Sequence, residues 1–524
     1  MPPDGTRAPT RRSVLRSSAI AGGLALAPGS ATAADDPERP DERFLVGAAK
    51  ASMNPEPPFE DVCLGGYGAF CARPMESVRN DLFARALAVT GDAAGGPPAN
   101  ARGPPAGRPG RGPPEAETLI VVTATAAGLF AAYKEAVGPY GCQPIREGIA
   151  AETGVPAGNV LVQGDHSHAA PDTIGIWGGV PASFFERLHD AAVKAATAAF
   201  RSREACGLSV GTTEAPIESL YREPPGSATD DEFRVLFAER DGERVATFVN
   251  YSPHPTVLGG QHSGGASGDW PAWAADRVET RAGGTGVAAV GALGAQDWGR
   301  GKAGSSDRRE ANARARLDRA LDGAYAARRP IEGSVVGVES TFVREQLAQP
   351  VLAGNLLPGA PGGPFADGEL SIDRSITPPW LTGDTVGTVV SAARVGDLFV
   401  GTAPGEPFPE VFDAVRERVD AREHMLLGVT NDFLGYMTVD PETYAQVTRQ
   451  GAGFLAGCPE ETLLEAVDNP DPACPDHWTL MVSPTIGRHV VCSLRDGAAS
   501  LGFDTDGEWP DCPVLTASDD VAAD

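Results

Sequence analysis

Four side chains of the types that bind divalent metals follow apolar runs with the composition of buried strands. A buried parallel strand is typically a continuous Val/Ile/Leu-rich run, and ligands collect just beyond the carboxyl ends of such strands. Two histidines, a carboxylate and a phenol delivered in this way could enclose one divalent cation, as in a zinc hydrolase. The segments are 160–168, 246–254, 398–406 and 426–436, with His166, His254, Glu406 and Tyr436 as the candidate ligands.

Histidine is scarce, with 8 in 524 residues, yet His166 and His168 are separated by a single serine. In an extended segment, residues i and i+2 point to the same side, so both rings could face one cavity. One ring could then bind metal while the other moves protons. Because a single loop histidine is usually only a polar side chain, the prediction depends on the four segments occurring together.

The N-terminus has the three regions of an export signal. Residues 10–16 contain a twin-arginine motif, residues 18–28 are mildly apolar, and Ala31-Thr32-Ala33 provides a small-residue cleavage site. The apolar stretch is too short and too rich in Gly and Ala to span a membrane. We therefore expect residues 1–33 to be a twin-arginine signal peptide, the protein to be secreted in folded form, and no transmembrane segment.

The chain is strongly acidic, with a formal charge of −27. Residues 1–33 carry four Arg and one Asp, so their removal brings the charge to −30. Such a surface repels phosphate backbones and anionic membranes, which argues against nucleic-acid binding.

Eight cysteines in an exported chain permit up to four disulfides, but the sequence does not choose among the pairings. Cys63 with Cys71 is the most local candidate, and the last four cysteines could form two bridges in the C-terminal region. The chain has no CxxC spacing, so a thiolate zinc site is not expected.

Strand-like and helix-like segments alternate along the chain, with helices expected at 145–153, 183–203, 270–281, 307–327, 408–422 and 483–501. This alternation predicts an α/β fold with mixed, largely parallel sheets flanked by helices, in a single large catalytic domain over residues 44–505. Residues 91–115 form a Pro/Gly-rich insertion that is expected to be disordered, and 354–368 a second surface loop. Residues 506–524 are expected to be an acidic tail.

Several motifs occur in the order found in one known family. They are Gly47–Ala51, Arg85–Leu87, residues 145–171 with Asp165-His166-Ser167-His168, His254-Pro255, Ser267-Gly268-Asp269, Pro404-Gly405-Glu406, and Asn431-Asp432-Phe433-Leu434-Gly435-Tyr436. In these motifs the chain resembles the catalytic domain of the neutral/alkaline (non-lysosomal) ceramidase family, over most of residues 44–505.

The resemblance implies a Zn²⁺ ion bound by His166, His254, Glu406 and Tyr436, and hydrolysis of an N-acyl amide such as ceramide by metal-activated water. It places His168 near the reacting centre, where it could pass a proton to the leaving group. Arg222 resembles a family arginine that approaches the site and could hold a carboxylate or an oxyanion. The alternative is that Arg222 has no role in the site and forms an ion pair at the protein surface. The substrate would be a small-molecule or lipid amide.

Two positions depart from the family pattern. Gly299 stands where the family has a serine with an assigned catalytic role, and Arg449 stands where family members place another active-site tyrosine. A mechanism that needs only zinc-activated water tolerates both changes, whereas a serine nucleophile does not. Two alternatives therefore stay open: a zinc hydrolase of another ester or amide, and a catalytically silent binding or scaffold protein.

Overall fold

In the computed structural model, every residue described below belongs to one compact unit within residues 39–524. The described residues are 43–59, 61–67, 71–93, 116–133, 138–175, 177–216, 219–220, 229–259, 264–294, 296–298, 304–346, 381–382, 385–439, 482–483, 485–507, 509 and 512. The predicted signal peptide, the 354–368 loop, and most of the 91–115 insertion and of the 506–524 tail lie outside them. Residues 91–93, expected to begin the insertion, are instead the end of a strand.

One 14-stranded sheet forms the centre of the unit. Its main path runs β11 (Thr285–Val290), β9 (Glu243–Tyr251), β8 (Glu232–Arg240), β6 (Glu204–Glu214), β1 (Phe44–Ser52), β3 (Phe83–Ala93), β14 (Val335–Gln346), β16 (Thr385–Val395), β17 (Leu398–Thr402) and β20 (Glu423–Leu427). Four strands pair beside this path: β4 (Ala116–Ala124), β5 (Val160–Gly164), β13 (Arg329–Pro330) and β15 (Leu381–Thr382).

Four short strand pairs lie outside the sheet: β2 (Ser77–Val78) with β10 (Gly265–Ala266), β7 (Ser219–Leu220) with β12 (Gln296–Asp297), β18 (Glu406–Pro407) with β21 (Tyr436–Met437), and β19 (Val419–Asp420) with β22 (Asp504–Thr505). The helices are α1 (Cys142–Thr153), η1 (Ala157–Asn159), α2 (Ala182–Arg201), α3 (Asp269–Ala282), α4 (Ser306–Ala326), α6 (Pro409–Arg416) and α9 (Ile486–Ser500).

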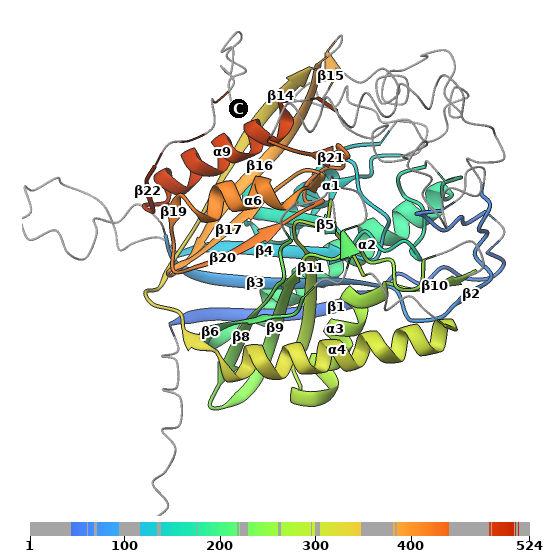
Figure 1. The fold of residues 1–524 in the computed structure, drawn as a ribbon, viewed down its shortest axis with the longest axis horizontal. Helices are drawn as coiled ribbons and strands as arrows, with labels where there is room; N and C mark the ends of the chain where they lie inside the picture. The colour runs from blue at the N-terminus through green and yellow to red at the C-terminus, as the bar shows by residue number, and fades with distance from the viewer. Residues whose placement is uncertain are drawn as a thin grey trace, which may run out of the picture. The chain divides into compact units, whose positions relative to one another are not determined.

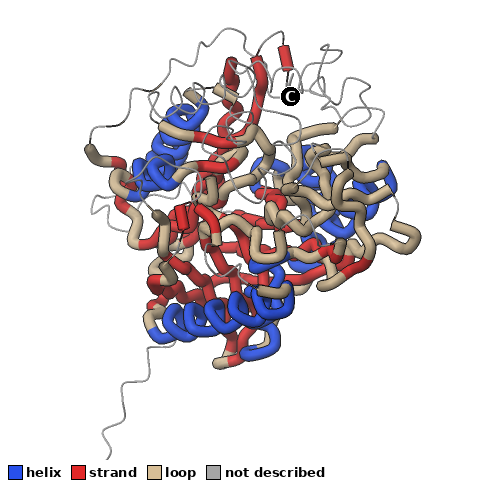
Figure 2. Tube along the Cα trace, turned by 45° about the vertical axis from the view of Figure 1, so that its right-hand side comes forward, coloured by secondary structure: helices blue, strands red, loops and turns tan. Residues whose placement is uncertain are grey.

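The helices flank the sheet in groups (Figures 1 and 2). Helix α2 packs on β1 and β3, α3 on β11, α4 on β6 and β8, and α9 on β16 and β14. The sequence of α2 explains why it packs against the sheet. Its apolar residues recur every three or four positions and form one buried stripe, comprising Phe184, Phe185, Leu188, Ala191, Ala192, Ala195, Ala196 and Ala199.

The predicted α/β class, a mixed sheet flanked by helices in one domain, is confirmed. Parallel pairing is less extensive than expected: within the sheet only β11 with β9, β4 with β5, β17 with β20 and the short β14–β3 contact are parallel. Two-residue turns explain part of the difference. Asp241-Gly242, both with positive φ, joins β8 to β9, and Gly396-Asp397 joins β16 to β17. Asp-Gly between two strands is a strong hairpin signal and imposes antiparallel pairing.

The six expected helices are present, but the one predicted over 408–422 is too long. Helix α6 ends at Arg416, and Val419 and Asp420 instead form β19, which pairs with β22 near the end of the chain. This pairing joins segments that are about 85 residues apart in the sequence, so local periodicity could not reveal it.

Two disulfides lie within the described residues. Cys63–Cys71 confirms the most local candidate, and Cys492–Cys512 is one bridge of the C-terminal group. Positions 458 and 474 lie outside the described residues. No helix among those described is long and apolar enough to cross a membrane.

Buried side-chain amides join strands from distant parts of the sheet. Gln163 of β5, which is fully buried, donates from Nε2 to the carbonyls of Val290 (3.1 Å) and Gly428 (2.6 Å), and its Oε1 accepts from the Val290 amide (3.0 Å). Asn250 of β9 donates to the Leu426 carbonyl (3.0 Å). The carboxyl ends of β5, β9, β11 and β20 are therefore held close together.

A buried ion cluster centred on Asp230 adds a second junction. Its carboxylate accepts hydrogen bonds from Arg234 (3.1 Å), Arg416 of α6 (2.7 Å) and Ser252 (2.6 Å). Burial alone would raise the pKa of Asp230, but the two guanidiniums outweigh it and lower the pKa to about 2. Asp230 is thus ionised and contributes to stability at neutral pH.

We expect Asp230→Asn to lower the free energy of unfolding near neutral pH by about 2 kcal/mol, the equivalent of the pKa shift. Because the folded-state pKa is depressed, this contribution is complete above the ordinary carboxyl pKa of 3.8 and disappears as the pH falls towards 2. Denaturant unfolding from neutral pH down to acid would measure it. Asp190→Asn, at an exposed position on α2, is the control; equal curves for the two variants would contradict the prediction.

Candidate metal centre

His166 follows β5 in a conformation that is unusual for a side chain of its size. Its φ is +57°, in the left-handed region, which costs a non-glycine residue roughly 1–2 kcal/mol. Contacts with two backbone carbonyls hold it there. Its amide donates to the Ala126 carbonyl (3.0 Å), and its imidazole Nδ1 lies 2.5 Å from the Ala127 carbonyl oxygen. The ring of Phe433 stacks on the imidazole with centroids 5.5 Å apart. The structure therefore fixes both the backbone and the ring of His166.

His254 follows β9 and is held by Gln296. Its backbone amide donates to the Gln296 carbonyl (2.9 Å), and its Nδ1 lies 3.1 Å from the same oxygen. Gln296 is itself fixed, because its Oε1 accepts from the Asp230 amide (2.7 Å). This role of Gln296 was not predicted from the sequence, because it depends on a backbone atom and a distant partner.

Glu406 and Tyr436 are brought together by two short parallel strands. Glu406 begins β18 and Tyr436 begins β21, and the two residues are direct partners in register. The Glu406 amide donates to the Gly435 carbonyl (2.8 Å). Side chains of partner residues in a sheet share a face. Both residues are buried, at 1% and 3% exposure.

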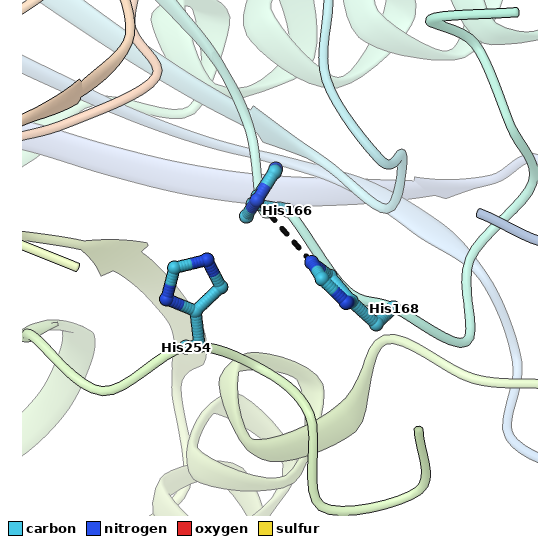
Figure 3. A group of neighbouring side chains, drawn as sticks. All are labelled: His166, His168 and His254. Atoms are coloured by element: carbon cyan, nitrogen blue, oxygen red, sulfur yellow. Dashed lines mark hydrogen bonds between the residues drawn. The ribbon is translucent and has the colours of Figure 1, made fainter. Parts of the chain in front are cut away.

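The ring nitrogens of three histidines converge (Figure 3), and the carboxylate of Glu406 lies beside two of them. His166, His168 and His254 each offer a ring nitrogen, and these nitrogens lie within 4.8 Å of one another. Glu406 Oε2 lies 3.0 Å from His254 Nε2 and 3.4 Å from His166 Nε2, and the Nε2 atoms of His166 and His168 are 3.4 Å apart. Ligands about 2.0–2.1 Å from a tetrahedral zinc ion are roughly 3.3 Å from one another. The donor set therefore has the spacing that fits a metal such as zinc.

The hydrogen bonds around the rings also suit metal binding. In both His166 and His254, Nδ1 faces a backbone carbonyl and Nε2 faces the Glu406 carboxylate. A carbonyl at Nδ1 selects the tautomer whose Nε2 lone pair is available to a metal, the usual second-shell arrangement. Burial alone would raise the pKa of Glu406, but the two histidines outweigh it and hold the pKa well below its usual range. The carboxylate is therefore an anionic donor.

His168 has a different environment from the other two rings. Tyr67 lies edge-on to it at 5.3 Å and Trp177 lies at 6.0 Å, both from loops that are only partly buried. The carbonyl of His168 accepts a hydrogen bond from Arg73 (2.7 Å). Sequence reasoning missed Tyr67, Trp177 and Arg73, because none of them belongs to a segment with helical or strand periodicity. Arg73 also lies 95 residues from His168 in the sequence. The only available signal was the cysteine pair around Tyr67.

The structure brings together His166, His168, His254 and Glu406, and places the Tyr436 backbone beside Glu406. Arg222, Gly299 and Arg449 lie outside the described residues, so their predicted positions stay predictions. Asp297, which immediately follows Gln296, is buried and accepts from the Trp298 amide (2.7 Å) and from the Thr256 hydroxyl.

No family model and no curated protein sequence matches the chain. Solved structures do. The neutral ceramidase from Pseudomonas aeruginosa matches with a TM-score of 0.62 and 18% identity, over 91% of this chain and 77% of that one. A ceramidase complexed with C2 matches with a TM-score of 0.60 and 16% identity, over 92% and 78%. At this level of identity the likeness concerns the fold: the chain has a ceramidase-like fold.

Proposed function

We propose that the protein is an exported zinc-dependent hydrolase of the neutral ceramidase type that cleaves an N-acyl amide bond. The observation that carries this proposal is the convergence of His166, His254 and Glu406, at zinc-ligand spacing, beyond the ends of three strands of a ceramidase-like fold. Two solved structures with this fold are named as ceramidases, and a ceramide-like amide is therefore the substrate class that we expect.

Each candidate residue of the chain would have a separate role in the reaction. His166, His254 and Glu406, with Tyr436 as a fourth donor, hold the ion. Zinc bound there supplies Lewis acidity, which lowers the pKa of water and polarises an acyl carbonyl. His168 passes a proton to the departing amine. Arg222 is proposed to hold the developing oxyanion. The three histidines and Glu406 are each at most 4% exposed, so bulk water is largely excluded and each electrostatic contact is strengthened.

The proposed location is outside the cytoplasm. Two disulfides support it, because such bonds persist in oxidising compartments. The twin-arginine motif of residues 10–16 supports export by the twin-arginine pathway.

We expect the purified mature protein to bind about one zinc ion per chain. His254→Ala should weaken binding by more than the 10–100-fold typical for loss of an outer-shell partner, because it removes a donor atom. Elemental analysis and competition with a chelator measure this. His189→Ala on α2 is a matched control and should bind zinc like the wild type. Absence of metal from the wild type would contradict the proposal.

We expect the enzyme to release fatty acid from an N-acylsphingosine, and Glu406→Gln to lower the rate by at least about 100-fold by removing the anionic donor. Glu417→Gln, at an exposed position just after α6, is the control and should keep the wild-type rate. A parallel screen of simple esters and short amides identifies the substrate class.

Equal rates for wild type and Glu406→Gln would reject the ceramidase proposal. Hydrolysis of esters alone would favour a different zinc hydrolase. Bound zinc without any hydrolysis would favour the silent scaffold that Gly299 and Arg449 leave open.

A further inference from the structure

A disulfide-closed segment lies directly against His168. It comprises residues 63–67 and 71–73 and contains the Cys63–Cys71 bridge. The Gly65 amide donates to the Ala170 carbonyl (2.9 Å), which joins the segment to the chain just beyond His168. The segment is thus bound to the backbone that carries the imidazole.

The fit between this segment and the imidazole is close. Gly66 has a φ of +95°, and a Cβ placed on it would lie 2.3–2.5 Å from atoms of the His168 side chain. The next residue, Tyr67, meets the imidazole edge-on. Tyr67 is confined in turn, because a Cβ on Gly259 would lie 2.3 Å from its ring. This segment therefore leaves the His168 side chain no free space on the side of Gly66.

Arg73 ties the segment to His168 from within. Its Nη1 donates to the carbonyls of both Gly65 (2.9 Å) and His168 (2.7 Å), and its guanidinium lies 5.5 Å from the Tyr67 ring centroid. Burial lowers the pKa of Arg73 to about 10, so the side chain stays cationic at neutral pH. A cation buried at 3% exposure bonds these carbonyls strongly.

A second loop also holds the disulfide. Asp172 accepts four backbone N–H groups of residues 174–179 and so fixes that loop. Two carbonyls of the loop accept hydrogen bonds from the cysteines: Gly179 from the Cys63 amide (3.0 Å) and Trp177 from the Cys71 amide (2.8 Å). A Cβ on Gly178 would lie 2.8 Å from the Cys63 sulfur. The bridge is therefore held by this loop as well as by its own segment.

We propose that the Cys63–Cys71 bridge, with Gly66 and Arg73, positions the His168 imidazole beside the donor cluster formed by His166, His254 and Glu406. The effect on catalysis rests on the proposed function, but the positioning itself does not. If the Cys63–Cys71 bridge only stabilised the fold, its loss should have a smaller effect than the loss of Cys492–Cys512. In the chain-entropy model a bridge that closes a longer loop stabilises the folded state more, and Cys492–Cys512 spans 20 residues whereas Cys63–Cys71 spans 8.

The test compares two double variants of the full mature chain, C63S/C71S and C492S/C512S. In C63S/C71S, kcat should fall by about 10-fold or more with a smaller change in KM, because a misplaced proton-transfer group slows the chemical step. The second should lose at least as much thermal stability and keep its kcat. If activity instead follows the fall in Tm in both variants, the bridge is merely structural and the proposal is overturned.

A readout that needs no substrate separates this proposal from the proposed function. On metal-free protein, the rate at which diethyl pyrocarbonate modifies His168 is mapped by mass spectrometry, with His189 of α2 as the internal reference. We expect the rate to rise about 10-fold in C63S/C71S, because the local opening free energy falls, and to stay unchanged in C492S/C512S. An unchanged rate in C63S/C71S overturns the positioning role, even if the wild type hydrolyses nothing.

Gly66→Ala supplies a second variant with the disulfide intact. Its methyl group would occupy space taken by the His168 side chain, so the His168 modification rate should rise and kcat should fall as in C63S/C71S. Zinc content reports on the donor cluster in the same samples. A Gly66→Ala protein with wild-type kcat and wild-type His168 reactivity would refute the packing argument.

Discussion

The donor cluster depends on the joining of strand ends that lie far apart along the sheet order. Strands β11 and β20 are the first and last on the main path, and β5 lies on a side branch. Gln163 hydrogen-bonds to residues at the ends of both β11 and β20, and Asn431 extends the contact by exchanging two hydrogen bonds with the Val162 backbone. A buried amide left without partners costs roughly 1–3 kcal/mol, so these contacts favour the arrangement in which the strand ends meet. In that arrangement Glu406 and the three histidines lie together.

A second constraint is the burial of charge. Glu406 is almost fully inaccessible to water, as is Asp230, and neither carboxylate would be ionised there without cationic or hydrogen-bonding partners. For Asp230 the partners are Arg234 and Arg416, which are permanently charged. For Glu406 they are imidazoles, whose Nδ1 atoms already face carbonyls. Either protons or a divalent cation must therefore lie between the Nε2 atoms and the carboxylate. A metal satisfies all of these donors at once, which is the physical basis for the zinc proposal.

The sequence predicted the parts of the site that are local to one strand. The apolar run 160–162 and the residues after it were enough to place His166 beyond a buried strand, and similar reasoning placed His254 and Glu406. What it could not predict are contacts between distant segments. Gln163 resembles any other polar residue in the sequence, and its role exists only because Val290 and Gly428 are brought to it. The sheet order was equally inaccessible, because strand runs do not reveal their partners. Arg73 was missed for the same reason.

The segment that contains Gly294 and Gln296 supports the donor cluster. Gln296 holds His254 through its backbone carbonyl, and the Gly294 amide donates to the Pro407 carbonyl, next to Glu406. A Cβ at Gly294 would lie 2.6 Å from the Glu406 carbonyl oxygen, so this approach requires glycine. The segment thus acts on both a histidine and the carboxylate through backbone atoms.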